Sequence, residues 1–217
     1  MGRAKLPRKS TSIDMTAMCD VAFLLLSFFI LTTKFKPSEA IAVTTPSSVA
    51  AKKAPKKNFV LVTIDKDGKV FLSIDDKNKR GDVIEYLNTY NQLGANVDKF
   101  KKADYIGASF AQLKSFLDKP QEQRVGDQLP GIPCKDSTNN ELVDWMRAVN
   151  SAYAGTKMDL LVKGDNLAKY PSFKGVITAF KKNDIQKFQI VTNPESAPIG
   201  SELYNRPNKG EGNQENN

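Results

Sequence analysis

The hydrophobic positions of this 217-residue chain follow two different patterns. Residues 21–31 are apolar apart from Ser27. From residue 58 onward, apolar residues come in short blocks that alternate with polar residues or recur at helical spacing. A continuous apolar run is typical of a membrane segment, whereas short periodic blocks are typical of a folded domain. The pattern therefore predicts a single N-terminal transmembrane helix followed by a small α+β domain.

The apolar run must be extended before it can cross a bilayer. Eleven residues of helix at about 1.5 Å per residue fall short of about 30 Å of hydrocarbon. Residues 13–33 are long enough, but they include Asp14 and Asp20. Asp14 can lie at the headgroup level, whereas Asp20 lies roughly 10 Å along the helix axis and cannot easily reach bulk water. An acid at that depth calls for a functional explanation.

Asp20 shares one side of the predicted helix with two hydroxyl side chains. At about 100° per residue, Thr16, Asp20 and Ser27 fall within about 40° of one another. Such a stripe faces a protein partner or a water path, because an ionised Asp at a helix centre in lipid costs about 2.5–3.5 kcal/mol. A carboxyl group in apolar surroundings favours its neutral form and releases its proton when water reaches it. The stripe predicts Asp20 as a proton carrier, with Thr16 and Ser27 on the proton path.

Two plainer interpretations of the apolar run stay open. It could be a cleaved signal peptide, with Ser38-Glu39-Ala40 as a small-x-small cleavage site, or a plain anchor in which Asp20 is tolerated. The chain would then be a secreted or membrane-anchored periplasmic binding protein. N-terminal sequencing of the mature protein separates the interpretations, because a start near Ile41 favours secretion. A further alternative is a structural anchor whose folded part binds peptidoglycan.

The formal net charge of +8 is concentrated around the apolar run. Residues 1–57 contain ten basic and three acidic residues, and the remainder of the chain is nearly neutral. Nucleic-acid binding would need a basic folded domain, so this distribution favours a lipid bilayer surface and argues against nucleic acid. Flanking charge does not fix the orientation. The head is short and the C-terminal part long, so we expect a single-pass protein with a cytoplasmic N-terminus and a C-terminal domain on the other side of the membrane.

Spacing and turn signals predict the elements of the folded part. They are a hairpin at 59–64 and 70–74, helices at 82–93 and 108–118, a helix from Thr138 to Gly155, and a strand–helix–strand unit at 158–162, 171–182 and 188–191. Asp67-Gly68 is a hairpin turn signal. Thr138 and Glu141 form a capping box, and Trp145 is expected in the core. The last unit predicts a right-handed parallel β-α-β crossover.

These elements divide the chain into consecutive parts. They are a cytoplasmic basic head (1–12), a transmembrane helix (13–33), a linker (34–57), a periplasmic α+β domain (58–192) with a long insertion (76–157), and a disordered tail (193–217). The linker is punctuated by prolines and lysine pairs, and Ile41 and Val43 could pair as a short strand if an edge is available. The tail is rich in Asn, Gly and Glu, which favours disorder.

The composition excludes several kinds of site. The absence of histidine rules out a Ser-His-Asp triad, a His-Glu-x-x-His zinc site and a His proton relay in this chain. Cys19 and Cys134 cannot meet if residues 13–33 span a membrane, so we interpret them as packing residues. There is no phosphate loop or dinucleotide fingerprint. We expect no enzymatic activity, no metal and no cofactor beyond protons, and interpret the folded part as a binding module.

Three blocks of the sequence carry a family resemblance. Residues 13–21, Ile-Asp-Met-Thr-Ala-Met-Cys-Asp-Val, precede the apolar run; Ile-x-Val-x-Thr-Pro follows it at 41–46; and LLVKGDNLAKYPSFKGVITAFKKNDIQKFQIVT ends at residue 192. In this order they resemble the ExbD/TolR family of biopolymer transport proteins, over residues 8–46, 58–75 and 158–192. The family signature is approximately Ile-Asn-Val-Thr-Pro-Phe-Ile-Asp-Val before an apolar helix. Lys163-Gly164-Asp165 stands where the family often has Arg-Ala-Asp.

The resemblance implies roles for the helix and its partners. Asp20 falls on the family's essential aspartate and Thr16 on its threonine. Two copies would place their helices inside a ring of a polytopic partner, ExbB or TolQ, and protons would pass at the interface through the aspartate. The motor would energise an outer-membrane system through a third protein such as TonB or TolA. Ala17 replaces the usual Pro and Asp14 the usual Asn, and residues 76–157 are much longer than the family's middle section.

Overall fold

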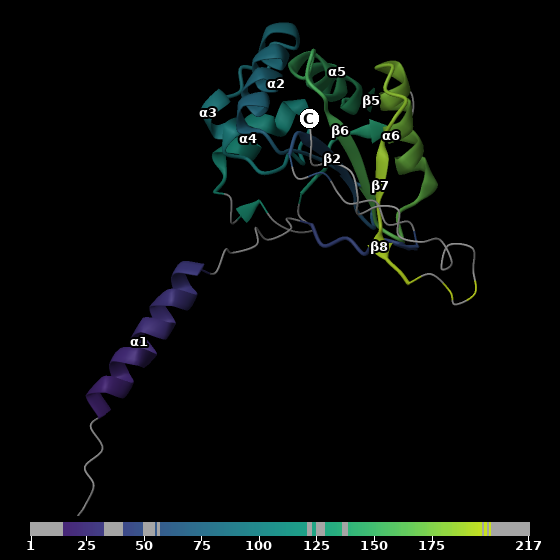
Figure 1. Cartoon of the computed structure of the whole chain (residues 1–217). Helices are drawn as coiled ribbons and strands as arrows, with labels where there is room; N and C mark the ends of the chain where they lie inside the picture. The colour runs from purple at the N-terminus through teal and green to yellow at the C-terminus, as the bar shows by residue number, and fades with distance from the viewer. Residues whose placement is uncertain are drawn as a thin grey trace, which may run out of the picture. The chain divides into compact units, whose positions relative to one another are not determined.

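The structure, a computed structural model, describes residues 15–32, 41–49, 55, 57–120, 123–124, 129–135, 139–196, 198 and 200. The chain divides into two compact units, Met1–Glu39 and Ala40–Asn217. The described element of the first unit is the helix α1 (Met15–Thr32). The second unit contains a mixed sheet covered by helices (Figure 1). The α+β class is therefore confirmed.

A four-stranded sheet with the order β3-β2-β6-β7 forms the centre of the second unit. Strands β2 (Phe59–Ile64) and β3 (Val70–Ile74) are the predicted antiparallel hairpin. Gly68 makes the turn possible, because its φ of 80° lies in the left-handed region that other residues rarely adopt. The amide of Gly68 donates to the carbonyl of Asp65 at 3.0 Å and closes the turn.

The C-terminal strand–helix–strand unit completes the sheet as predicted. β6 (Asp159–Gly164) pairs in parallel with β2 on one side and with β7 (Gln189–Val191) on the other. α6 (Tyr170–Lys182) joins β6 to β7. Pro171 lies in its first turn, where backbone amides have no partner within the helix, so the missing N–H of proline costs no hydrogen bond. The carboxyl ends of β2, β6 and β7 therefore lie at one edge of the sheet, next to the start of α6.

The insertion between β3 and β6 builds a helical layer. Its elements are α2 (Lys77–Tyr90), α3 (Val97–Lys101), the 3₁₀ turn η1 (Phe110–Gln112), α4 (Leu113–Asp118), β4 (Cys134–Lys135), β5 (Asn139–Asn140) and α5 (Leu142–Ala152). α2 packs on α3 and α5, and α5 packs on α6. Isolated bridges from Ile106 to Leu72 and from Ile132 to Val70 cover the outer edge of β3. The insertion thus protects an edge that would otherwise expose unpaired backbone groups.

The core lies between the sheet and these helices. Alternate residues of β2, namely Val60, Val62 and Ile64, are buried in one cluster with residues of α2, α5 and α6. Trp145 of α5 is 0% exposed and stacks on Phe100 with 5.8 Å between the ring centroids. Its predicted place in the core is confirmed.

The start of α2 differs from the prediction. The helix begins at Lys77 rather than at residue 82, because the carboxylate of Asp76 accepts the amide of Asn78 at 2.7 Å and caps it. Arg80 is only 7% exposed, and its Nε donates to the carbonyl of Ile74 at 2.6 Å. The polar first turn is thus part of the packed layer, which the apolar spacing did not show. The helix ends at Tyr90 instead of residue 93.

Two further helices differ in their first turns. The helix expected at 108–118 is the 3₁₀ turn η1 followed by α4. The helix expected from the capping box is α5, which begins at Leu142 and ends at Ala152 rather than at Gly155. Thr138 lies outside the described residues. The carboxylate of Glu141 accepts the amide of Phe110 at 2.7 Å, so this side chain links α5 to η1.

Part of the predicted linker pairs with the start of the predicted tail. β1 (Ser47–Ser48) is parallel to β8 (Asn193–Pro194). The short strand expected at Ile41 and Val43 therefore occurs a few residues later, and Ile41 instead packs against the core. We refer to residues 41–48 as the docked segment. The head, the rest of the linker at 34–40, 50–54 and 56, and the tail from residue 201 lie outside the described residues.

Candidate functional site

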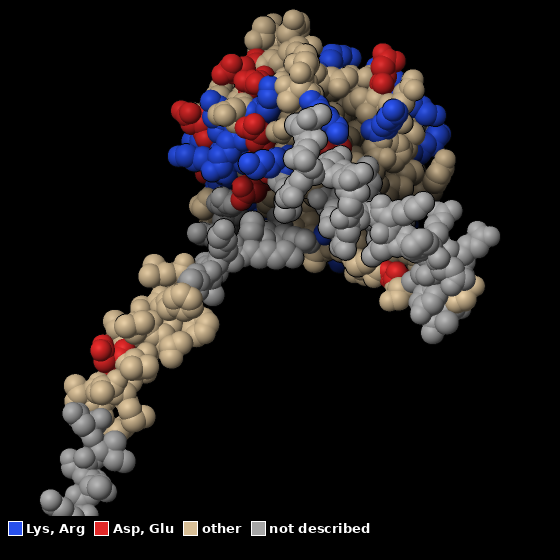
Figure 2. All heavy atoms as spheres, viewed as in Figure 1, with Lys and Arg blue, Asp and Glu red and all other residues tan. Residues whose placement is uncertain are grey.

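The three residues predicted for proton transfer all lie on α1. Thr16 and Asp20 are exposed and one turn apart, and Ser27 follows Asp20 on the same side, about 10 Å further along the axis. The hydroxyl group of Ser27 donates to the carbonyl of Leu24 at 2.9 Å, and its oxygen can still accept a hydrogen bond. In Figure 2, an acidic group stands out on a helix whose other visible side chains are uncharged.

Apolar side chains cover the surface of α1 outside its polar stripe. Its large apolar residues are between 50% and 85% exposed within their own unit. A helix with so large an exposed apolar surface needs lipid or other protein chains around it. Within the described part of the chain, no helix is both long and apolar enough to cross a membrane. Ile13, Asp14 and Thr33 of the predicted segment lie outside the described residues, and the transmembrane span stays a prediction.

Asp165 attaches the docked segment to the folded unit. Its Oδ2 accepts the amide of Thr44 at 2.9 Å, and its Oδ1 accepts the amide of Leu167 at 2.8 Å. The amide of Asn166 donates in turn to the carbonyl of Thr44 at 2.8 Å. This geometry follows from the Gly-Asp-Asn turn after β6, because an aspartate in a turn accepts the amide two residues on. One carboxylate therefore organises its own loop and holds the docked segment.

The other end of the docked segment is held by β8. The amide of Asn193 donates to the carbonyl of Pro46 at 3.0 Å, and its side-chain amide donates to the carbonyl of Thr45 at 3.1 Å. The amide of Glu195 donates to the carbonyl of Ser48 at 2.9 Å. Backbone groups from both ends of the folded unit are thereby paired with each other.

Hydrogen bonding stabilises the ionised form of Asp165. The amide of Leu167, then that of Thr44, lower the pKa of the carboxyl below its ordinary value of 3.8, and Lys66 acts in the same direction. Partial burial opposes this shift and is the weaker effect. The carboxylate is therefore charged at neutral pH, and its attachment to the docked segment persists well into the acid range.

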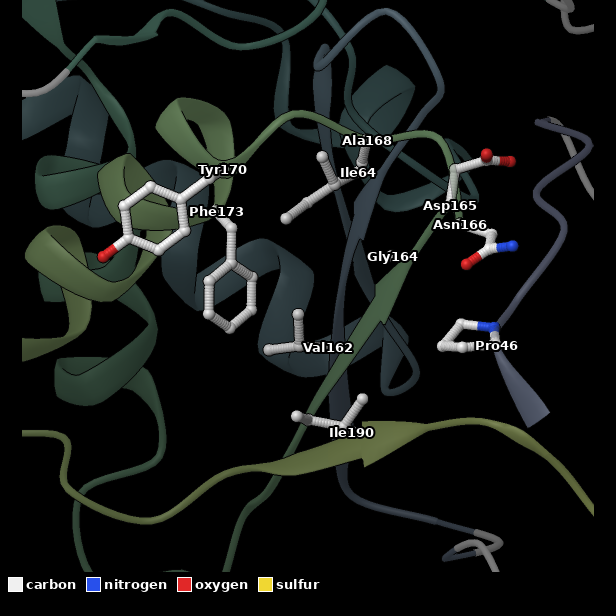
Figure 3. Close-up of a pocket in the computed structure, with 10 residues that line it drawn as sticks. All are labelled: Pro46, Ile64, Val162, Gly164, Asp165, Asn166, Ala168, Tyr170, Phe173 and Ile190. Atoms are coloured by element: carbon white, nitrogen blue, oxygen red, sulfur yellow. The ribbon is translucent and has the colours of Figure 1, made fainter. Parts of the chain in front are cut away.

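A cleft of about 330 Å³ lies beside this attachment, at the carboxyl ends of β2 and β6. Ten residues line it: Pro46, Ile64, Val162, Gly164, Asp165, Asn166, Ala168, Tyr170, Phe173 and Ile190. Figure 3 shows Phe173, Val162 and Ile190 directed toward one another, with the ring of Tyr170 pointing away from them. The walls are mainly apolar, and the carboxylate of Asp165 already accepts hydrogen bonds from the amides of Thr44 and Leu167. The cleft is therefore suited to an apolar side chain of a protein partner.

The family resemblance indicates no role for Asp165 beyond its place as the last residue of Lys163-Gly164-Asp165. A Gly-Asp-Asn turn directly after a buried strand is a local signal for an aspartate that binds backbone amides. Its second partner, Thr44, is 121 positions away, and no local pattern indicates it. In the part of the chain that the structure describes, no group of three or more His, Cys, Asp and Glu side chains could hold a metal.

Comparison with known proteins agrees with the resemblance of the three blocks. Residues 7–195 match the family described as biopolymer transport protein ExbD/TolR. The chain belongs to the ExbD/TolR family. Neither the curated proteins nor the solved structures contain a match to it. The ExbD/TolR match spans α1, the docked segment, the cleft and the insertion, and it places the chain among biopolymer transport proteins.

Proposed function

We propose that this ExbD/TolR protein is the proton-conducting subunit of an ExbB/ExbD-type complex in the bacterial inner membrane. The complex uses the proton motive force to energise outer-membrane transport through a TonB-like protein. The polar stripe of Thr16, Asp20 and Ser27 on an otherwise apolar helix carries the proposal. The family match supports it, because the match includes this helix.

Asp20 carries the proton in the proposed mechanism. It takes up a proton from one side of the membrane and releases it toward the other side as the surroundings of the helix change. Thr16 lies one turn before it and Ser27 two turns after it, so their hydroxyl groups extend the polar path along the helix. Each proton that crosses a potential of 100 mV releases about 2.3 kcal/mol, which the assembly converts into motion.

The exposure of α1 determines which partners the mechanism needs. Its apolar side chains need lipid or protein around them, and its polar stripe needs a protein partner. A ring of an ExbB/TolQ-like polytopic subunit and a second copy of this chain would supply that partner. The folded unit, on the periplasmic side, would contact the TonB-like protein without catalysing a reaction.

Replacing Asp20 tests the proposal. Asp20→Asn preserves the size and shape of the side chain but removes ionisation, so proton-driven transport in cells that depend on this chain should be abolished. Asp14→Asn is a matched control, because it removes the neighbouring acid and restores the residue usual in the family. Full transport activity with Asp20→Asn, at equal protein level, would exclude the carrier role.

The competing interpretation makes the apolar run a targeting device for a periplasmic binding protein. N-terminal sequencing of the mature chain decides between them. Under our proposal the mature protein retains α1. A mature N-terminus near Ile41 would remove Asp20 from the working protein and support the binding protein instead.

A further inference from the structure

The outer side of α6 combines basic and apolar side chains. Leu167, just before the helix, is 73% exposed, and Tyr170 in its first turn is 72% exposed. Lys174 follows Tyr170 by four residues and Lys181 follows Lys174 by seven, which places the three side chains on one side of the helix. Six exposed residues form this α6 patch: Leu167, Lys169, Tyr170, Lys174, Lys181 and Lys182.

The net positive charge of the folded unit comes from the stretch of chain that contains this patch. Residues 166–190 contain five lysines and one acidic residue, whereas residues 58–165 contain fifteen basic and sixteen acidic residues. Figure 2 shows blue side chains at the edge of the folded unit where Figure 1 places α6, and a second blue group, mixed with red side chains, over α2, α3 and α4. The patch is thus complementary to an anionic surface.

Helix stability alone explains only half of these lysines. Lys181 and Lys182 lie in the last turn of α6, where positive charge is favourable with the helix dipole. Lys169 is the N-cap of the helix, where the same dipole disfavours positive charge, and Lys174 lies beyond the first turn, where the dipole has little effect. Exposed Leu and Tyr side chains beside lysines are instead the combination found at membrane interfaces.

The docked segment, which follows α1 in the sequence, is attached to the folded unit beside this patch. Asp165 binds the amides of Thr44 and Leu167 with its two oxygens, so the segment is attached directly beside the patch. Eleven residues separate Thr32, the end of α1, from Thr44. Fully extended, they span about 40 Å. A chain anchored through α1 would therefore hold the patch at high local concentration near its own bilayer.

We propose that the α6 patch binds the anionic headgroups of the bilayer in which the chain is anchored. Leu167 and Tyr170 enter the interface, and the lysines contact the lipid phosphates. This docking gives the folded unit a defined position close to the membrane. The inference rests on the proposed function, because it requires the membrane anchor.

Lysine acetylation of the full chain in lipid nanodiscs tests this docking. The discs contain phosphatidylcholine with or without phosphatidylglycerol. In anionic discs at low salt, we expect Lys174, Lys181 and Lys182 to react several-fold more slowly than in neutral discs, and the difference to disappear at high salt. Lys77 and Lys114, exposed on α2 and α4, should react equally in both. Equal acetylation rates at α6 in the two kinds of disc would overturn the proposal. An acidic protein partner for the patch would then be the alternative.

Two matched variants separate the patch from general charge. Replacement of Lys174, Lys181 and Lys182 by Gln should weaken docking roughly 100-fold, at about fivefold per lysine, and should expose Lys169 to acetylation. Replacement of Lys77, Lys102 and Lys114 by Gln removes the same charge elsewhere and should leave Lys169 protected. Loss of protection in both variants would overturn the proposal. A chain that does not co-purify with the discs lacks the anchor and contradicts the proposed function, whereas a co-purifying chain with an unprotected patch contradicts only the docking.

Discussion

Loss of the Asp165 carboxylate should release the docked segment while the sheet stays folded. Asp165→Ala removes the acceptor for the amides of Thr44 and Leu167. Hydrogen bonds to a charged group contribute about 1.5–3 kcal/mol each. Water can reach this half-buried carboxylate, so we take the lower value. Only the bond to Thr44 joins the docked segment to the turn, because the bond to Leu167 lies within the turn itself. Losing about 1.5 kcal/mol corresponds to about a 10-fold shift from the docked to the released segment.

Hydrogen exchange at β8 measures this release without relying on the mutated contact. The amides of Asn193 and Glu195 donate to the docked segment and do not touch Asp165. Their exchange should accelerate about 10-fold in Asp165→Ala, and less in Asp165→Asn, which keeps one carbonyl acceptor. Exchange at Val62 in the core should not change.

The control is Asp98→Asn, because it removes an exposed acid from α3 on the insertion. It should leave exchange at Asn193 and Glu195 unaltered. If Asp165→Ala also leaves these two amides at their original rates, Asp165 does not hold the docked segment, and the hydrogen-bond argument is wrong.

Three other predictions follow from local geometry. Gly175→Ala should destabilise the folded unit by about 1–3 kcal/mol, because the new Cβ would lie 2.2 Å from the carbonyl oxygen of Cys134. Gly164→Ala is the control, because a Cβ at that position meets open space. Equal melting temperatures of the two variants would contradict the prediction. Burial, then nearby aspartates, raise the pKa of Tyr153 from 10.0 to about 12. Its contribution to stability is therefore complete below pH 10 and declines by roughly 3 kcal/mol as the pH rises to about 12. Tyr153→Phe should abolish that decline in alkaline unfolding curves. Because the pKa of Asp165 is lowered, the carboxylate stabilises the docked segment fully at pH values above its ordinary pKa of 3.8, and this stabilisation is lost as the pH falls below that value. Loss of amide protection at β8 already at pH 6 would contradict this.

The parts of the fold that depend on local sequence could be predicted. The hairpin follows from alternating β-branched residues around Gly68, and the parallel unit follows from the apolar spacing of α6 between two apolar strands. Both signals lie within a few residues of the structure they specify. The polar stripe on α1 is local in the same sense, because helical geometry alone places Asp20 beside Thr16 and Ser27.

The parts that depend on distant contacts could not be predicted. The start of α2 is polar. Arg80 belongs to the packed layer only because its guanidinium group donates hydrogen bonds to carbonyl groups of β3 and of the segment after α3. The pairing of β1 with β8 joins segments separated by almost the whole folded unit. Asp165 shows both cases, since its contact with Leu167 follows from its turn and its contact with Thr44 does not.

Proton flux through the reconstituted complex tests the central claim most directly. The chain and its polytopic partner would be placed in liposomes with a potassium-driven membrane potential, and proton uptake would be followed with an internal pH dye. We predict potential-dependent uptake with the natural chain and with Asp14→Asn, and uptake at the level of protein-free liposomes with Asp20→Asn. Undiminished uptake through the Asp20→Asn complex would contradict the account.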